Sequence, residues 1–328
     1  MICQGALPFP TASSPLPVIG RLGRPEPDAP AIRRHPAIAH PEVEYFELPI
    51  RDILNRCTSE RMPFVWTINP YRGCEFGCTY CYARYTHGFF DLERWQDFET
   101  KIFVKREAGV ALERRLRKAA LQGEPIAIGT ATDPYQPAEA HYRITRSLLE
   151  VFRKAEGLDL SITTKSPLVT RDVDLLTELD RRHTVRVNFT VTTTDPQLAR
   201  RLEPQAPDPR ARLRAIETLT EAGIETHLYV MPLLPGINNA EAPLRELFQA
   251  ALNVGVTDVA ASPLFLRPAA RARFWPWLKE QFPKLVPLYE RLYGDRDYVS
   301  TRQAEDLKMN YRRLKLEYGF PVARPGRS

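Results

Sequence analysis

The sequence contains few cysteines for its length and no long hydrophobic run. Five cysteines occur in 328 residues, which is too few for a disulfide framework in a chain of this size. No apolar run reaches the roughly 18 residues that a membrane-spanning helix needs. Residues 1–20 lack the positively charged start of a signal peptide. These features predict no association with a membrane and favour the cytoplasm.

The composition also excludes disorder for most of the chain. A hydrophobic content of 43% is ample for a large core. Residues 1–40 differ because they contain eight prolines, which predict an extended or disordered tail. We therefore expect a tail over residues 1–40, an α/β domain over residues 41–265 and a helical extension over residues 266–328.

Three of the five cysteines lie close together, with the spacing C-x3-C-x2-C at Cys74, Cys78 and Cys81. Thiolates suit iron–sulfur clusters, zinc or copper(I). Gly73 and Gly77 allow the backbone to turn tightly around a metal centre. No fourth cysteine follows nearby. A four-iron cluster held by three thiolates would leave one iron open for a substrate or cofactor.

Two other metal sites stay open at this point. The three cysteines with His87 would make a Cys3His zinc site, and with Cys57 they would make an electron-transfer cluster. In the zinc interpretation, the chain is a zinc-stabilised nucleic-acid-binding protein without radical chemistry.

Short strand-like segments alternate with helical segments along the chain. The predicted strands are 64–68, 101–105, 125–130, 158–163, 185–191, 226–231 and 256–261, and the predicted helices are 108–121, 144–154, 172–181, 210–222 and 242–253. This alternation predicts parallel βαβ units. About six repeats are too few to close an eightfold barrel. The cysteines follow the first strand, so we expect them at the carboxyl ends of the strands, where chemistry occurs in such folds.

The cysteine spacing with Tyr80 resembles the C-x3-C-x-aromatic-C signature of the radical S-adenosylmethionine (SAM) superfamily. The stretch from Asn69 to Pro204 is similar to the branch that includes spore photoproduct lyase. This resemblance implies an open partial (β/α)6 TIM-like barrel and a [4Fe-4S] cluster on the three cysteines. It further implies that the open iron binds SAM and that one electron cleaves SAM to a 5′-deoxyadenosyl radical, which abstracts hydrogen from a substrate.

The resemblance assigns polar residues at the other strand ends to SAM. Thr130, Thr132 and Asp133 are candidates for its amino group, although the family's usual Gly-Gly-Glu triplet is missing. Lys165 is a candidate for the SAM carboxylate or a substrate phosphate. The other candidates are Tyr80, Thr190, Thr192, Arg201 (with Glu203 as its ion-pair partner) and Pro232. Each also has a structural interpretation, as a turn, a solvated charge or a core residue.

One position departs from the lyases. Spore photoproduct lyases carry a hydrogen-donating cysteine at the end of the second strand, and Thr130 takes that place here. A hydroxyl is a far poorer hydrogen-atom donor than a thiol. We therefore do not expect lyase activity on thymine photoproducts.

The positive charge is concentrated near the C-terminus. Residues 267–328 hold 14 Lys and Arg against 7 Asp and Glu, whereas the rest of the chain holds 32 against 33. Basic residues interleaved with aromatics there could bind a nucleic acid; the alternative is a helical cover with a solvated basic face. We expect a one-electron reductant such as flavodoxin or ferredoxin as a partner and nucleic acid as the first candidate substrate.

Overall fold

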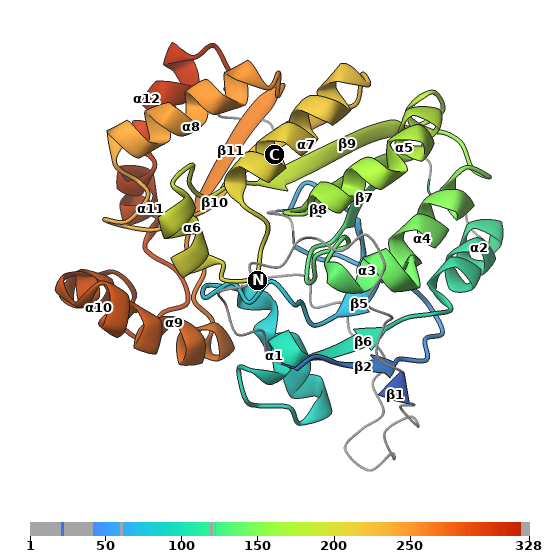
Figure 1. Cartoon of the computed structure of the whole chain (residues 1–328), viewed down its shortest axis with the longest axis horizontal. Coiled ribbons are helices and arrows are strands. Elements are labelled where there is room, and N and C mark those ends of the chain that lie inside the picture. Colours follow the sequence, from blue (N-terminus) through green and yellow to red (C-terminus); the bar gives the residue numbers. More distant parts are fainter. Residues whose placement is uncertain (1–20, 23–41, 60–61, 119–120, 122, 323–328) are drawn as a thin grey trace.

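The computed structural model describes residues 21–22, 42–59, 62–118, 121 and 123–322. Its strands form one sheet of seven strands and one of four. Helices lie along the outer side of the larger sheet (Figure 1). The predicted tail, residues 1–40, falls outside the described residues except for Arg21–Leu22, which form a short strand.

The larger sheet has the strand order β11-β10-β9-β8-β7-β4-β3. Neighbouring strands are parallel, except that β3 is antiparallel to β4 at one edge. The strands are β3 (Leu54–Arg56), β4 (Trp66–Ile68), β7 (Pro125–Ile128), β8 (Asp159–Thr164), β9 (Thr184–Thr190), β10 (Glu225–Leu233) and β11 (Asp258–Pro263). The prediction of an α/β fold with a mostly parallel sheet is confirmed.

The smaller sheet has the order β1-β2-β6-β5. Its strands are β1 (Arg21–Leu22), β2 (Glu44–Glu47), β5 (Tyr71–Arg72) and β6 (Lys101–Val104). The segment predicted as a strand at residues 101–105 thus belongs to this second sheet. The sequence does not predict this, because a short apolar run does not reveal its pairing partner. Strand β5 leads directly into the cysteines.

Helices connect the strands and cover the sheet. Between β4 and β11 they are η1 (Tyr82–Phe90), α1 (Asp97–Thr100), α2 (Ala108–Lys118), α3 (Pro137–Tyr142), α4 (Ile144–Phe152), η2 (Pro167–Asp172), α5 (Val173–Asp180), α6 (Pro196–Leu202), α7 (Pro209–Glu221) and α8 (Glu241–Asn253). After β11 follow α9 (Pro268–Gln281), η3 (Pro283–Leu285), α10 (Val286–Tyr293), α11 (Thr301–Leu307) and α12 (Met309–Glu317). Within the described residues, no helix combines the length and apolarity needed to cross a bilayer.

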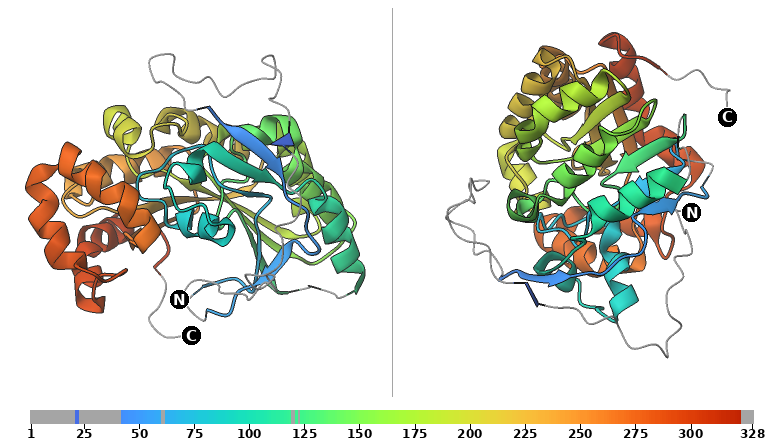
Figure 2. Two further views of the ribbon diagram at one scale, coloured as in Figure 1. Left: turned by 90° about the horizontal axis from the view of Figure 1, so that it is seen from below. Right: turned by 90° about the vertical axis from the view of Figure 1, so that its right-hand side faces the viewer.

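Side chains alternate between two faces along the parallel strands. In β8, Leu160 and Ile162 are fully buried in the main core, whereas Ser161 and Thr163 line a large cavity. The same alternation continues along β10. Figure 2 shows the green and yellow helices along one face of the larger sheet. The sheet therefore separates the main apolar core from the cavity, into which polar side chains of its strands point.

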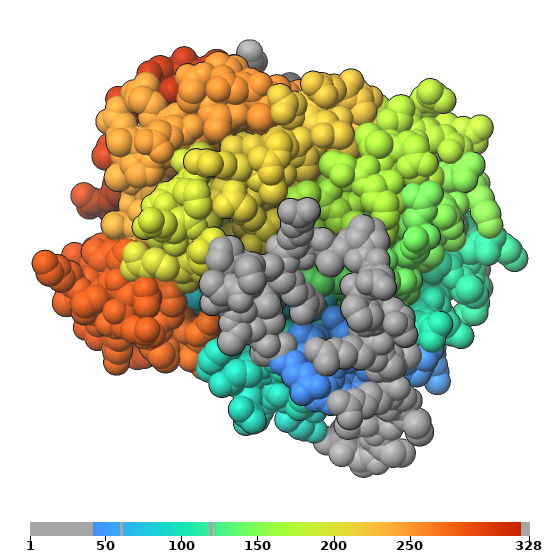
Figure 3. All heavy atoms as spheres, in the orientation of Figure 1, coloured from blue at the N-terminus to red at the C-terminus, as the bar shows by residue number. Residues whose placement is uncertain are grey.

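The basic and aromatic residues after β11 mostly have partners inside the protein. Arg271 donates hydrogen bonds to three backbone carbonyls, and the Arg273 guanidinium lies 4.1 Å from the centre of the Trp95 ring. Phe274 and Tyr311 are buried. Arg201 of α6 donates a hydrogen bond to Gln281 of α9, and Figure 3 shows the orange segment that follows β11 against the yellow segment that contains α6. This arrangement fits a helical cover better than an open surface for nucleic acid.

The assignment of the two faces can be tested in β8. We expect Ile162→Ala to lower the free energy of unfolding by about 2–5 kcal/mol, because it leaves a cavity in the core. Val110→Ala, at an exposed site on α2, should change it by less than about 0.5 kcal/mol. Urea denaturation measures both values, and equal effects would contradict the assigned faces.

Candidate functional site

The cysteine loop, residues 73–81, lies at the carboxyl ends of the parallel strands. Its first residue, Gly73, has a φ of +87°, and a Cβ atom there would lie 2.9 Å from the carbonyl oxygen of Lys101. Only glycine fits this turn without a shift of the backbone. The amide of Cys74 then donates a hydrogen bond of 2.9 Å to the carbonyl of Phe98, which fixes the start of the loop.

Side chains from the loop after β7 hold the cysteine loop in place. The carbonyl of Gly73 accepts hydrogen bonds from the Thr132 hydroxyl at 2.6 Å and from the Gln136 amide at 3.2 Å. The Gln136 oxygen accepts from the amide of Glu75 at 3.0 Å. Thr132 is thus a support of the loop, and Gln136 is a second support that the sequence analysis missed.

A cavity of about 2670 Å³ opens beside this loop. All three cysteines line it. Most of the residues that the sequence analysis assigned to SAM also line it, namely Tyr80, Thr130, Thr132, Asp133, Lys165, Thr190 and Pro232. The fold therefore brings these residues together around one space, although Thr192 and Arg201 are not part of its wall.

The cavity wall disfavours charged thiols. Burial raises the pKa of the Cys74 thiol well above its usual value, and it raises the pKa of Cys78 to about 12. The pKa of Cys81 is also raised, mainly by burial. Neighbouring thiols add to the effect on Cys74 and Cys78, so the three sulfur atoms influence one another. Binding of a metal centre would therefore release protons from these thiols.

A single zinc ion fits these residues poorly. His87, the candidate fourth ligand, is buried with its Nε2 atom 2.9 Å from the carbonyl oxygen of Lys101, and its ring packs between Phe98 and Phe103. Among the described residues, no three His, Cys, Asp or Glu side chains converge on a position for one metal ion. A tetrahedral zinc ion needs sulfur atoms within roughly 4 Å of one another, whereas a four-iron cluster binds each thiolate to a different iron.

Cys57 lies at the other end of strand β4. Its amide donates a hydrogen bond to the carbonyl of Val65, just before the strand begins. The cysteine loop follows the opposite end of the strand. This position does not support Cys57 as a fourth ligand.

Tyr80 is fixed by a buried ion pair. Its hydroxyl donates a hydrogen bond to Glu203, and Glu203 pairs with Arg212 at 2.5 Å, with both charged side chains almost fully buried. Arg212 also donates to the carbonyls of Thr190 and Pro207. Burial acts to raise the pKa of Glu203, but Arg212 and Lys165 outweigh it and lower that pKa. Glu203 is therefore a carboxylate.

Asp133 joins the loop after β7 to the end of β8. Its carboxylate accepts hydrogen bonds from the Thr164 hydroxyl at 2.7 Å, from the amide of Tyr135 at 2.9 Å and from the amide of Lys165 at 2.7 Å. The Lys165 ammonium lies 5.9 Å from the centre of the Tyr80 ring. Asp133 therefore positions Lys165 next to the cysteine loop.

Arg201 points away from the cavity. It is exposed on α6, donates two hydrogen bonds to Gln281 and lies 4.2 Å from the centre of the Phe282 ring. The ion-pair partner of Glu203 is Arg212, so the predicted pairing of Glu203 with Arg201 is wrong. The exposed position of the Arg201 side chain gives no support to a role for this residue in SAM binding.

Two further predicted residues lie at the ends of β9 and β10. The Thr192 hydroxyl donates to Glu203 at 3.3 Å. The side-chain nitrogen of Asn238 donates hydrogen bonds to the backbone carbonyls of both Thr192 and Pro232. Asn238 thus joins the two strand ends, which the sequence analysis also missed because the residue lies in an irregular loop.

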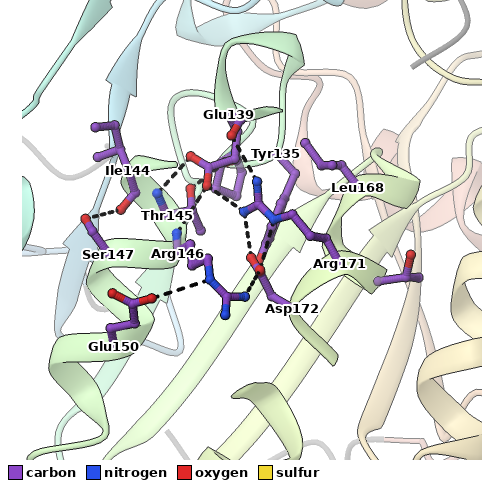
Figure 4. A network of polar contacts seen from close by, with 12 residues as sticks. Tyr135, Glu139, Ile144, Thr145, Arg146, Ser147, Glu150, Leu168, Arg171 and Asp172 are labelled. Carbon is purple, nitrogen blue, oxygen red and sulfur yellow. Dashed lines mark hydrogen bonds and ion pairs between the residues drawn. The ribbon is translucent and has the colours of Figure 1, made fainter. Parts of the chain in front are cut away.

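A second buried network, of hydrogen bonds and ion pairs, joins α3, α4 and η2, which follow the loop after β7 (Figure 4). Glu139 accepts hydrogen bonds from the hydroxyl of Tyr71 at 2.5 Å and from Arg171 at 2.9 Å. Asp172 pairs with both Arg146 and Arg171. Because Tyr71 lies on β5, this network links the strand before the cysteines to α3, α4 and η2.

The chain is similar to known proteins in both sequence and fold. Residues 68–248 match the family model of the Radical SAM superfamily. An uncharacterized protein of Mycobacterium tuberculosis is 34% identical over 277 residues, which cover 84% of this chain and 81% of that protein. An uncharacterized protein of Methanocaldococcus jannaschii is 30% identical over 177 residues, or 54% of this chain and 63% of that protein.

Solved structures share the fold at low sequence identity. A spore photoproduct lyase complexed with dinucleoside spore photoproduct has a TM-score of 0.62 and 17% identity, and the match covers 83% of this chain and 79% of that one. A double mutant of spore photoproduct lyase with bound AdoMet and the same dinucleoside has a TM-score of 0.61 and 18% identity, with 84% and 79% covered. These likenesses concern the fold alone.

The buried ion pair beside Tyr80 can be tested by mutation. We expect Arg212→Met to lower the free energy of unfolding by about 3–5 kcal/mol, because it leaves the Glu203 charge buried without its main partner. The double variant Glu203→Gln/Arg212→Met should recover part of this loss.

Arg245→Met serves as the control, because Arg245 forms an exposed ion pair with Glu317 and its loss should cost no more than about 1 kcal/mol. Urea denaturation measures all three variants. A loss at Arg212 no larger than at Arg245 would show that the buried pair does not hold the site together.

Proposed function

Because this chain belongs to the Radical SAM superfamily, we propose that Cys74, Cys78 and Cys81 hold a [4Fe-4S] cluster whose fourth iron binds SAM. The observation that supports this proposal most is the position of the three thiols, which share one cavity wall with the polar strand ends. We interpret β4 and β7 to β11 as an open (β/α)6 partial barrel with this cavity at its mouth.

The bound cluster would supply one electron to SAM, whose sulfonium would then split into methionine and a 5′-deoxyadenosyl radical that abstracts hydrogen from the substrate. The protein's own residues would bind the cluster, orient SAM and exclude water. Lys165 places a positive charge beside the thiols and is our candidate for the SAM carboxylate. Tyr80, held by Glu203, shapes the adenine side of the pocket, to which Pro232 also contributes.

In this proposal the threonines and Asp133 contribute mainly by holding neighbouring groups of the site in place. Thr130, Thr190 and Asp133 line the cavity, but the Asp133 oxygens already accept three hydrogen bonds from the protein. Its contribution to SAM binding is therefore the placement of Lys165. Thr192, outside the cavity wall, contributes through Glu203.

For the substrate we propose a nucleic acid. Spore photoproduct lyase, which shares the fold, has been solved with a dinucleoside spore photoproduct. In this chain, aromatic rings and an arginine line the cavity near Tyr82. The Arg267 guanidinium lies 4.5 Å from the centre of the Tyr85 ring, and Phe265 stacks on Tyr298 at 4.2 Å. Such rings can stack on bases, and the arginine can contact phosphate.

The reaction differs from that of the lyases in our proposal. The Thr130 hydroxyl lies within hydrogen-bonding distance of Asn69, and its carbonyl accepts a hydrogen bond from Tyr82. A threonine in the place of the lyases' cysteine supplies no thiol hydrogen. The zinc-binding alternative is not favoured, because His87 is used elsewhere. A flavodoxin or ferredoxin in the cytoplasm is the expected electron source.

The cluster proposal predicts a specific loss of activity. The protein, reconstituted anaerobically with iron and sulfide, should form 5′-deoxyadenosine from SAM with dithionite, as measured by liquid chromatography. Cys78→Ala should reduce this to the background of cluster-free protein, because a thiolate ligand is lost.

The matched control is Thr218→Ala on the exposed side of α7, which should retain full activity. Formation of 5′-deoxyadenosine by Cys78→Ala at the rate of the control would contradict the assignment of the cluster ligands.

The substrate proposal predicts salt-dependent binding of single-stranded oligonucleotides. Arg267→Gln should weaken binding about equally for different sequences and reduce the slope of log K against log salt by about 1, because one phosphate contact is lost. Arg312→Gln is the control, since Arg312 pairs with Glu305. Fluorescence anisotropy at several salt concentrations measures both slopes, and equal slopes for Arg267→Gln and the unmodified protein would exclude this contact.

A further inference from the structure

Lys105 is a lysine buried without a carboxylate partner in the cavity wall. It follows strand β6 and is 8% exposed. Its ammonium donates one hydrogen bond, of 2.7 Å, to the carbonyl of Asn69. Within the described part of the chain, no Asp or Glu forms an ion pair with it. An ammonium carries three donors, so two of them have no acceptor among the described residues.

The surroundings of Lys105 make a positive charge costly there. Burial, together with a smaller contribution from the nearby Arg72, lowers the pKa of its ammonium to about 7. Arg72 is the charged group that acts on Lys105, across the antiparallel pair of β5 and β6. A buried amine beside a second cation tends to lose its proton, and it keeps its charge best when an anion compensates it.

Both cations face the same cavity as the cysteines. Arg72, Lys105 and Asn69 all line it. The Arg72 guanidinium donates to the carbonyl of Thr86 at 3.3 Å and lies 4.8 Å from the centre of the Phe90 ring, which fixes its orientation. Arg72 lies on β5 of the smaller sheet and Lys105 follows β6, whereas Lys165 lies at the end of β8 in the larger sheet.

We propose that Lys105, with Arg72 beside it, forms a subsite for an anionic oxygen group of the substrate, a phosphate or a carboxylate. The inference rests on the proposed function only in taking this cavity as the place where the substrate binds. An anion at this position supplies acceptors for the two remaining Lys105 donors and compensates the Lys105 charge. The Lys165 ammonium, beside the thiols, is the candidate for SAM, so the Lys105 subsite is assigned to the substrate.

Asn69 connects this subsite to the SAM side of the cavity. Its backbone carbonyl accepts from Lys105, while its side-chain oxygen accepts a hydrogen bond of 2.7 Å from the amide of Ala131. Its side-chain nitrogen donates to the hydroxyl of Thr130 at 3.1 Å. An anionic group bound at Lys105 is thereby held at a fixed position relative to the loop after β7, where the resemblance to the family places SAM.

The subsite can be tested by lysine labelling of the reconstituted protein. Limiting formaldehyde with cyanoborohydride at neutral pH methylates neutral amines, and peptide mass spectrometry reports the extent at each lysine. With inorganic phosphate present at about ten times its Kd, methylation of Lys105 should fall about tenfold. Lys154, which is exposed and pairs with Glu113, is the internal control and should not change.

Separate arms with inorganic phosphate, acetate and SAM identify the occupant. Protection by phosphate supports a phosphate group of the substrate, and protection by acetate alone supports a carboxylate. Protection by SAM alone would overturn the proposal, because SAM would then occupy the site. Unchanged labelling in every arm would also overturn it. None of these arms depends on SAM cleavage, so failure of the cluster proposal would be seen separately.

Variants give a second measurement. Lys105→Gln should weaken the binding of inorganic phosphate, measured by calorimetry, about tenfold, which corresponds to about 1.4 kcal/mol. Lys105→Arg should retain most of the affinity because it keeps the charge and its donors. Equal affinities of Lys105→Gln and the unmodified protein would contradict an anion site at this lysine.

Discussion

The arrangement of the cysteine loop depends on one carbonyl group. Gly73 adopts a backbone conformation that other residues rarely adopt, and its carbonyl oxygen accepts hydrogen bonds from both Thr132 and Gln136. These two side chains come from the loop after β7, so the loop after one strand is anchored to the loop after its neighbour. Because β4 and β7 are parallel, both loops leave the same edge of the sheet. These hydrogen bonds thus hold the cysteine loop so that its three cysteines line the cavity.

Charge balance is the second constraint on this site. Burial keeps the free thiols protonated, and two buried carboxylates, Glu203 and Asp133, lie in the same region. The cations Arg212 and Lys165 offset these negative charges, and Lys165 is held by the Asp133 oxygens through its backbone. On the smaller sheet the balance is reversed, because Lys105 has no carboxylate partner among the described residues. Beside the thiols, the positive and negative charges of the cavity wall therefore balance. On the side of the smaller sheet, Lys105 leaves the wall positive.

The sequence predicts the local features well and the long-range pairings poorly. The cysteine loop and the main parallel strands could be identified because spacing and alternation are local signals, and the polar strand ends then converge by topology. The composition of residues 101–105 predicts a strand, but it does not indicate that the strand pairs with β2 and β5. Proximity in sequence favours a pair of Arg201 with Glu203, whereas helix α7 brings Arg212 to that carboxylate. Nothing in the residue types around Lys105 indicates that its side chain is buried without a partner.

The central claim is that the three thiols hold a four-iron cluster with one iron open to SAM. The most direct test is the electron paramagnetic resonance spectrum of the reconstituted, reduced protein before and after addition of SAM, with iron, sulfide and zinc measured on the same sample. We predict about four irons and four sulfides per chain and a reduced-cluster signal whose g values shift when SAM binds. About one zinc per chain with no such signal, or a cluster signal that SAM leaves unchanged, would contradict the account.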